Sequence, residues 1–156
     1  MRNDGTAWER TVQDICDEYE RKGIMRVKKV SPPTLVINKR VVHLPNPFPD
    51  FVGSFTSYGG RMIALEVKST MEPRLPLGDR GLTANQQDAL HQWHAAGAIA
   101  YVLWIHDAKM AAIPWSWINN GSHAKSIAWS DASMFCVKQG IGRIIWDFEL
   151  VIRKYL

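Results

Sequence analysis

The fold of this chain is decided by residues 61–68, which read Arg61-Met62-Ile63-Ala64-Leu65-Glu66-Val67-Lys68. Aliphatic and other side chains alternate in this stretch, and successive side chains of a β-strand point to opposite faces. A strand would place Ile63, Leu65 and Val67 on one face. Glu66 and Lys68 would share the other face. The pattern therefore predicts a strand that buries its aliphatic face and directs two opposite charges the same way.

A second strand precedes this stretch and folds back on it. Gly59-Gly60 supplies a turn, so residues 50–57 and 61–68 form a predicted hairpin. The hairpin brings Asp50 close to Glu66, and two neighbouring carboxylates require a cation to compensate their charge. We predict a metal site, and magnesium suits it, because this hard cation prefers carboxylate oxygens and keeps several of its waters.

The trio of Asp50, Glu66 and Lys68 predicts hydrolysis of phosphodiesters. A carboxylate-held metal can neutralise the scissile phosphate and supply a hydroxide-like nucleophile. The backbone carbonyl of Val67 lies between the two charged side chains of the strand and could complete the metal shell. Lys68 would orient the attacking water or stabilise the charge that develops on the phosphate. The alternative is a plain ion pair between Glu66 and Lys68 on an exposed strand.

Two further polar residues lie near predicted helix starts. Thr6-x-x-Glu9 and Thr83-x-x-Gln86 both match the capping box, in which Glu or Gln bonds back to the start of its helix. Glu9 borders the apolar stripe of its helix, so it could equally reach the metal, directly or through water. Gln86 lies on a packing face, where a glutamine needs a polar partner. A metal-bound water or Lys68 could provide that partner, so we favour the site role for Gln86.

Size and charge bound the class of protein. The chain has 156 residues, 46% of them hydrophobic, which is enough for one core, so we expect a single domain over residues 1–156. The net charge of +4 at pH 7 fits a polyanionic partner without establishing one. Basic residues gather early in the chain and around the acidic motif, although a solvated face is the commoner explanation of any one charge. The predicted DNA-binding residues are Lys28, Lys29, Lys39, Arg40, Arg61, Ser69, Thr70, Arg74 and Arg80.

Cysteine and histidine usage gives no further site. Cys16 and Cys136 form no CxxC or Cys/His pattern, so we expect neither a disulfide framework nor a zinc site. His91-x-x-His94 has helical ligand spacing but no third ligand. The N-terminus lacks the apolar stretch of a signal peptide, and the longest apolar run is too short for a membrane span. We expect a cytoplasmic protein in a reducing compartment, with no membrane partner.

Periodicity and breaker residues predict the other elements. Before the central hairpin we expect a helix at residues 6–22 ended by Gly23, a basic strand at 24–30, and a hairpin at 34–44 with Asn38-Lys39-Arg40 at its tip and Pro45-Asn46-Pro47 at its end. After it we expect a mobile surface loop at 69–82, a helix at 83–96, a strand buried on both faces at 98–105, a strand at 110–113, a helical turn at 114–118 and a closing helix at 144–155.

The order of these motifs resembles the PD-(D/E)XK nuclease superfamily and, within it, the RecU-like Holliday junction resolvases. Gly5-x-x-x-Glu9 is similar to the opening motif of that family, and residues 28–33 are similar to its basic strand and proline turn. Asp50-Phe51-Val52-Gly53 is similar to its Asp-aromatic-x-Gly signature, and residues 60–70 to its central strand. Leu82-Thr83-x-x-Gln86 resembles its downstream glutamine motif. The resemblance covers about residues 5–105.

The resemblance implies an α/β restriction-endonuclease-like fold, in which a central mixed β-sheet is flanked by α-helices and a short β-hairpin protrudes. The site residues that it implies are the metal ligands Asp50 and Glu66, the catalytic Lys68, and the supporting Glu9 and Gln86. The protrusion of the family is shortened here to about residues 34–46, and the compact size is compatible with a phage-encoded version.

The same resemblance implies a magnesium-dependent endonuclease that accepts manganese and cuts four-way DNA junctions in recombination, repair or phage DNA processing. A homodimer would present two equivalent sites to two opposed strands. Two alternatives stay open: a related endonuclease for duplex or flap DNA, and a junction-binding protein without activity.

Overall fold

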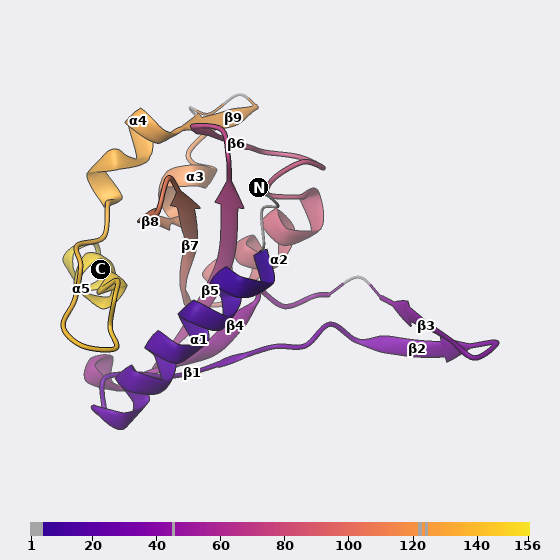
Figure 1. The fold of residues 1–156 in the computed structure, drawn as a ribbon, viewed down its shortest axis with the longest axis horizontal. Coiled ribbons are helices and arrows are strands. Elements are labelled where there is room, and N and C mark those ends of the chain that lie inside the picture. Colours follow the sequence, from indigo (N-terminus) through magenta and orange to yellow (C-terminus); the bar gives the residue numbers. More distant parts are fainter. Residues whose placement is uncertain (1–4, 45, 122, 124) are drawn as a thin grey trace.

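The structure is a computed structural model that describes residues 5–44, 46–121, 123 and 125–156. Its centre is a five-stranded mixed sheet (Figure 1). In spatial order the strands are β1 (Arg26–Lys29), β4 (Phe51–Phe55), β5 (Arg61–Thr70), β7 (Ile99–His106) and β8 (Lys109–Pro114). β5 and β7 are parallel, and the other three neighbouring pairs are antiparallel. The predicted mixed sheet is confirmed.

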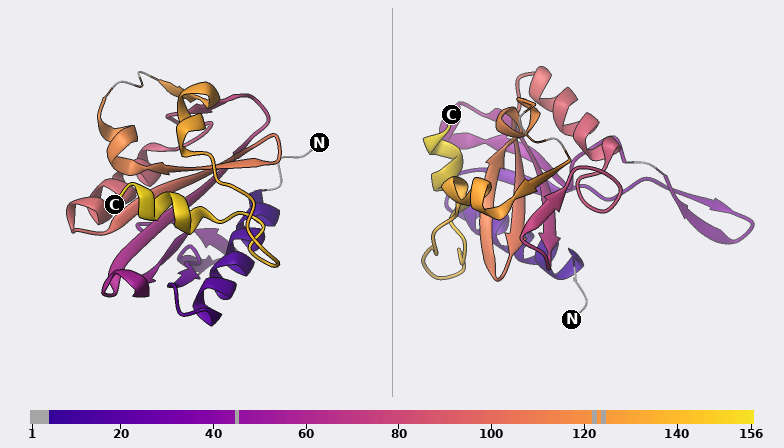
Figure 2. Two further views of the ribbon diagram at one scale, coloured as in Figure 1. Left: turned by 90° about the vertical axis from the view of Figure 1, so that its left-hand side faces the viewer. Right: turned by 90° about the horizontal axis from the view of Figure 1, so that it is seen from above.

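One face of the sheet is covered by the first and last helices (Figures 1 and 2). α1 (Gly5–Arg21) buries a stripe that includes Val12, Ile15 and Tyr19. Gly23 follows with a φ of +70°, a left-handed value that glycine adopts readily, and it ends the helix as predicted. α5 (Phe148–Lys154) joins the same core, with the rings of Tyr19 and Phe148 edge to face at 5.2 Å.

The opposite face is covered by α2 (Ala84–Ala95) and α3 (Trp115–Asn119). Leu90 of α2 and Trp115 and Ile118 of α3 lie in a second core with side chains of β7 and β8. β7 is buried on both faces, as its continuous apolar run predicts. The sheet is therefore the middle layer of three, and the predicted helices on both sides are confirmed.

The phase of β5 assigns its side chains to the two faces. Ile63, Leu65 and Val67 belong to the core under α1 and are buried. Glu66 pairs with Val102 of β7 and Lys68 with Trp104, and both of these β7 residues belong to the core under α2. Glu66 and Lys68 therefore share the α2 face of the sheet, as the alternation predicts.

A hairpin arm projects far from the body (Figures 1 and 2). β2 (Thr34–Ile37) and β3 (Arg40–His43) form a two-stranded sheet of their own, and all of their residues are exposed. Asn38 and Lys39 have φ values of +50° and +61°, which are typical of a two-residue type I′ turn. The predicted hairpin is confirmed over 34–43, hereafter the arm, and Pro45 at its predicted end lies outside the described residues.

The predicted mobile loop at residues 69–82 is wrong. β5 continues to Thr70, and β6 (Arg74–Pro76) pairs with β9 (Ser126–Ala128) in a second small sheet, hereafter the side sheet. Leu75 and Leu82 are completely buried. Prolines, glycines and charges dominate the stretch, so its two buried leucines gave too weak a pattern, and the partner strand lies far along the chain.

The closing helix is shorter than the predicted range 144–155. The backbone N–H of Asp147 donates to the carbonyl of Lys138 at 3.0 Å, and the Tyr19 hydroxyl donates to the Asp147 carboxylate at 2.7 Å. These bonds tie Asp147 to distant parts of the chain, so α5 begins only after it. Periodicity also missed α4 (Trp129–Ala132) and two 3-10 turns, Thr56–Tyr58 and Ser133–Phe135. In the described part of the chain, no helix is long and apolar enough to cross a bilayer.

Candidate active site

Asp50 and Glu66 meet where β4 begins beside the middle of β5. Phe51 of β4 pairs with Leu65, so Asp50 lies opposite Glu66. The backbone N–H of Val67 donates to Asp50 Oδ2 at 2.9 Å, and the backbone N–H of Asp50 approaches Glu66 Oε2 at 3.3 Å. The predicted hairpin and the approach of its two carboxylates are confirmed.

The Glu66 carboxylate is buried and incompletely bonded. Glu66 is 1% exposed, and its Oε1 has no hydrogen-bond partner among the residues that the structure describes. Lys68 Nζ lies 3.5 Å from Oε1, an ion-pair distance that is too long for a strong hydrogen bond. The Glu66–Lys68 ion pair of the alternative is therefore present, but its strand is buried and not exposed, and a buried carboxylate with an unbonded oxygen needs a stronger partner.

Burial shifts both carboxyl groups toward their protonated forms. Desolvation, reinforced by the charge of Asp50, raises the pKa of Glu66 to about 8, and Lys68 only partly opposes this. Desolvation also raises the pKa of Asp50, against the hydrogen bond from Val67. Such an arrangement disfavours two negative charges in the bare protein and would favour them beside a cation.

The donor set fits a hard divalent cation. The N–H and C=O groups of one strand residue point to the same side, so the Val67 carbonyl also points toward Asp50, where β4 begins. Two carboxylates and one carbonyl form the partial shell that magnesium completes with water. In the described residues no group of three or more His, Cys, Asp or Glu side chains is arranged to hold a metal.

Glu9 reaches this site from α1. Its carboxylate forms an ion pair with Lys29, and its charge contributes to the raised pKa of Asp50. Thr6 lies inside the first turn of α1 instead of preceding it. Of the two roles that the sequence left open, proximity to the site is the one that the structure supports.

Gln86 occupies the capping position. The Thr83 backbone N–H donates to Gln86 Oε1 at 3.0 Å, and the Gln86 backbone N–H approaches the Thr83 hydroxyl at 3.3 Å. This complete capping box corrects our preference for a site role, because the side-chain oxygen is already bonded to the helix start. The amide NH₂ group is the part of Gln86 for which a role at the site stays a prediction.

Several predicted phosphate contacts are bonded elsewhere. The Thr70 hydroxyl donates to the Glu72 carbonyl at 2.7 Å and accepts from Trp104 Nε1 at 2.8 Å, so its proton is not available to a phosphate. Arg61 lies at the opposite end of β5, five residues or about 17 Å from Glu66, and donates to the Gly97 carbonyl. Thr70 and Arg61 are therefore removed from the predicted phosphate contacts.

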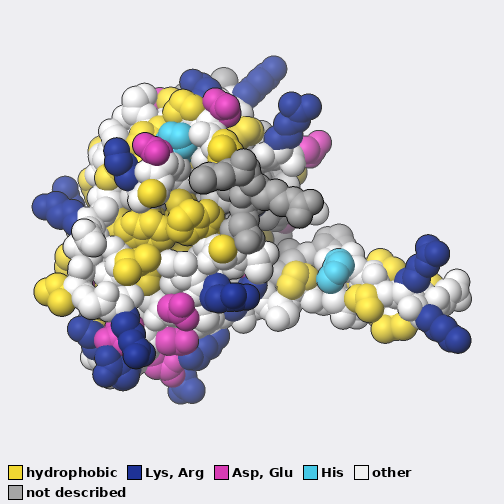
Figure 3. Space-filling model, viewed as in Figure 1, with side chains coloured by type: hydrophobic (Ala, Val, Ile, Leu, Met, Phe, Trp, Pro, Cys, Tyr) yellow, Lys and Arg dark blue, Asp and Glu magenta, His cyan; other side chains and the backbone are white. Residues whose placement is uncertain are grey.

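The other basic residues divide into paired and exposed groups. Lys28 pairs with Asp17 and Glu20 of α1, which offsets its charge. Lys29 pairs with Glu9 at the site. The residues that expose their charge are Lys39 and Arg40 at the tip of the arm, and Arg74 and Arg80 near the side sheet. Figure 3 shows Lys and Arg side chains at the far end of the projecting arm, clear of the body.

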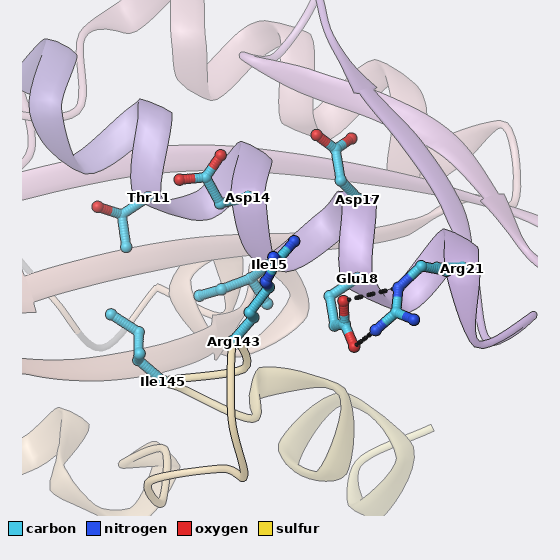
Figure 4. A pocket seen from close by; sticks show the side chains of 8 residues that line it. All are labelled: Thr11, Asp14, Ile15, Asp17, Glu18, Arg21, Arg143 and Ile145. Atoms are coloured by element: carbon cyan, nitrogen blue, oxygen red, sulfur yellow. Dashed lines mark hydrogen bonds and ion pairs between the residues drawn. The ribbon is translucent and has the colours of Figure 1, made fainter.

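A groove of about 580 Å³ lies away from this site, between α1 and the loop before α5. Figure 4 shows Glu18 forked to Arg21 on its wall, and Arg143 reaching from the loop toward the helix. None of the residues that line the groove belongs to the site of Asp50 and Glu66. The candidate active site lies instead on the sheet where β4 starts.

The fold and this site together define a restriction-endonuclease-like α/β domain, which confirms the predicted fold class. Among solved structures, the chain is similar to Hjc of Archaeoglobus fulgidus, a Holliday junction resolvase from an archaeal hyperthermophile. The TM-score is 0.54 at 23% sequence identity, over 80% of this chain and 91% of that one. No protein-family model and no curated protein matches the chain.

Proposed function

We propose that the chain is a metal-dependent DNA endonuclease that cuts four-way junctions, that is, a Holliday junction resolvase. The observation that carries the proposal is the pair of the half-buried Asp50 and the buried Glu66, with Lys68 beside it and the unbonded Glu66 Oε1 within it. The similarity of the fold to an archaeal Holliday junction resolvase supports the same class. The sequence motifs favour the RecU-like branch of these enzymes.

Each residue of the site has a chemical task in this reaction. Asp50, Glu66 and the Val67 carbonyl would hold Mg²⁺, or Mn²⁺ in its place, which supplies charge neutralisation and an activated water. Lys68 is mostly buried on the same strand face as Glu66, so its ammonium is held close to the carboxylate. There it can orient the attacking water or offset the charge that develops on the phosphate. Glu9 and Lys29 form an ion pair at the border of the site.

The charge distribution supports a DNA partner. No acidic residue occurs between Arg21 and Asp50, a stretch that contains the whole arm and six basic residues. The arm carries Lys39 and Arg40 at its far end and projects well beyond the sheet (Figure 3). A projecting basic ribbon can contact a branched DNA away from the scissile phosphate, and contacts to the DNA backbone select shape and not base sequence. Opposed cuts require two equivalent centres, which a twofold dimer supplies.

Incubation of the purified protein with a synthetic four-way junction tests this proposal. We expect paired cuts at symmetric positions in two opposed strands, with magnesium or manganese present and not with chelator. A flap and a linear duplex of the same sequence are the matched substrates. Preferential cutting of either would favour another PD-(D/E)XK endonuclease, and junction binding without nicking would leave a non-catalytic binding protein.

A further inference from the structure

An aromatic group lies at the end of β7, where β7 meets the side sheet. The ring centroids of Trp104 and Trp129 are 4.9 Å apart, those of His106 and Trp129 are 5.3 Å apart, and those of Trp104 and His106 are 6.4 Å apart. Trp104 is completely buried, whereas His106 and Trp129 are half-buried. His106 and Trp129, hereafter the aromatic shelf, therefore expose part of two rings above a buried tryptophan. Sequence reasoning assigned neither residue a role.

The shelf lies on the same face of the sheet as the catalytic residues. Lys68 pairs with Trp104, and Thr70 pairs with His106, along the parallel strands β5 and β7. The hydrogen bond from Trp104 Nε1 to the Thr70 hydroxyl confirms that these side chains share one face. His106 is two residues beyond the row of Lys68, which is about 7 Å along the sheet. A nucleotide chain bound at Lys68 would reach the shelf within a step or two.

Both rings of the shelf are held in place. The contact of 3.2 Å between His106 Nδ1 and the Thr70 carbonyl requires a hydrogen on Nδ1, because a carbonyl only accepts. Nε2 is then the nitrogen left for a ligand. Trp129 directly follows β9, and its backbone N–H donates to the Pro73 carbonyl at 2.9 Å. A fixed aromatic surface loses little freedom when a planar ligand stacks on it.

Positive charge accompanies the shelf. Arg74 of β6 pairs with Ala128, the residue before Trp129, and its Nε donates to the Ser126 hydroxyl at 2.9 Å. Its guanidinium forms no ion pair with a carboxylate in the described part of the chain and is exposed. Figure 3 shows Lys and Arg side chains along the upper edge of the body, near β6 and β9, with a few acidic ones among them. Aromatic rings beside exposed arginine are the composition of a platform for unpaired nucleotides.

We propose that the aromatic shelf binds an unstacked nucleobase of the DNA strand whose phosphate lies at Lys68. The base stacks on the exposed ring surface of Trp129 beside His106, and Arg74 contacts the adjoining backbone. Fully paired duplex keeps its bases stacked inside the helix and cannot use this surface. The shelf would therefore select DNA that is opened near the cut, as at a strand exchange point. This inference rests on the proposed nuclease function.

Binding of the full chain to two DNAs, measured without divalent metal, tests the shelf. One probe is a four-way junction with two unpaired thymines at its centre, and the other is a linear duplex of the same sequence. We expect Trp129→Ala to bind the open junction roughly tenfold less tightly and the duplex with an affinity changed by less than about twofold. Trp129→Phe should retain most of the affinity, because it keeps a stacking ring.

The matched control is Trp117→Ala, which removes another half-buried tryptophan on the same core. Trp117 lies in α3, which follows Pro114, and Pro114 pairs with Tyr101 at the opposite end of β7 from His106. The control should leave the discrimination between the two DNAs intact. Three results would each refute base binding by the shelf. They are an equal loss of affinity for both DNAs with Trp129→Ala, no loss of affinity with Trp129→Ala, and the same loss of affinity with Trp117→Ala.

A cross-link to the unaltered protein keeps the test decisive if Trp129→Ala does not fold. With 5-iodouracil in place of the unpaired thymines, we expect attachment to the peptide that spans residues 126–132. Attachment only to other peptides would exclude the shelf. Junction cleavage by the unaltered protein, measured in parallel, separates the two proposals. If the protein cleaves junctions and Trp129 plays no role in binding, only the shelf proposal is refuted. If the protein neither cleaves nor binds junction DNA, the proposed function itself is refuted.

Discussion

Two β-hairpins of this molecule are rich in aliphatic side chains and lie in opposite environments. In the hairpin of β4 and β5, each strand has a second neighbour, and Ile63, Leu65 and Val67 are buried under α1. In the arm, β2 and β3 pair with each other alone, and Val36 is 73% exposed. The local pattern specifies a strand in both places. Burial depends on whether helices and neighbouring strands cover the hairpin.

The contrast extends to charge. The central hairpin places the buried Glu66 carboxylate beside the half-buried Asp50, and desolvation raises the pKa of both groups, so the surroundings resist their ionisation. The arm holds Lys39 and Arg40 in solvent, where a charge is fully hydrated. One hairpin therefore has the features of a reaction centre, in which a cation is needed, and the other those of a surface that meets phosphates. Substitutions in each hairpin test this division.

The largest expected effect is the loss of cleavage with Glu66→Gln. Loss of the charge weakens the metal site at its most buried ligand, so we expect cleavage to fall by roughly 10³-fold or more. Junction affinity in chelator should stay within about twofold, because the arm is untouched. Glu72→Gln, an exposed carboxylate after the same strand, is the control. Full cleavage by Glu66→Gln under saturating magnesium would refute the assignment of the reaction centre.

The second effect is a pH dependence of stability that comes from the central hairpin. The folded protein holds the Glu66 proton up to a pKa of about 8, against 4.5 for the ordinary group, so it binds more protons than the unfolded chain between these values. The bound Glu66 proton therefore contributes fully to the free energy of unfolding below about pH 4.5, and this contribution is lost as the pH rises toward 8. A pKa raised from 4.5 to about 8 corresponds to at most about 5 kcal/mol.

Thermal unfolding in chelator between pH 5 and pH 8 measures this dependence. We expect Tm to fall as the pH rises and Glu66→Gln to flatten the curve. Added magnesium should reduce the fall, because it stabilises the ionised pair. A Tm that rises over this range, in both the parent and the variant, would show that the carboxylate pair is ionised in the folded protein without metal.

The third prediction compares how much stability is lost when a side chain is truncated in each hairpin. Leu65 is completely buried, so Leu65→Ala should destabilise the protein by about 2–5 kcal/mol. Val36→Ala removes an exposed methyl pair on the arm and should change the free energy of unfolding by less than about 0.5 kcal/mol. Urea denaturation followed by fluorescence measures both values. A large loss with Val36→Ala would mean that a second copy or another segment covers the arm.

The sequence predicted the elements that local patterns specify. The strand phase of residues 61–68, the turn at Gly59-Gly60 and the hairpin tip at Asn38-Lys39 all follow from neighbouring residues, and with them the approach of Asp50 to Glu66. The side sheet could not be predicted, because β6 and β9 are short and lie far apart in the chain. Partners of single side chains were equally hidden: the bonds of Thr70 and Arg61 depend on Glu72, Trp104 and Gly97.

The fourth effect concerns the charges of the arm. Replacing Lys39 and Arg40 by alanine should weaken junction binding and reduce the slope of log affinity against log salt by about two, since each lost phosphate contact lowers it by about one. Lys22→Ala, outside the arm, serves as the control for net charge. Titrations at several salt concentrations give the slope. An unchanged slope would show that the arm is not part of the DNA-binding surface. The proposed division between a reaction centre and a phosphate-binding arm would then fail for the arm.

The smallest effects are expected at the two turns. Gly59 has a φ of +65°, so Gly59→Ala should destabilise the whole protein by about 1 kcal/mol, because its hairpin is part of the core. Lys39 has a φ of +61°, and Lys39→Gly should stabilise the arm by a similar or smaller amount. Since the arm pairs with no other strand of the described residues, Tm should not change with Lys39→Gly, and only hydrogen exchange of the arm amides should slow. A matching rise in Tm would show that the arm unfolds together with the core, and the two hairpins would then be one cooperative unit.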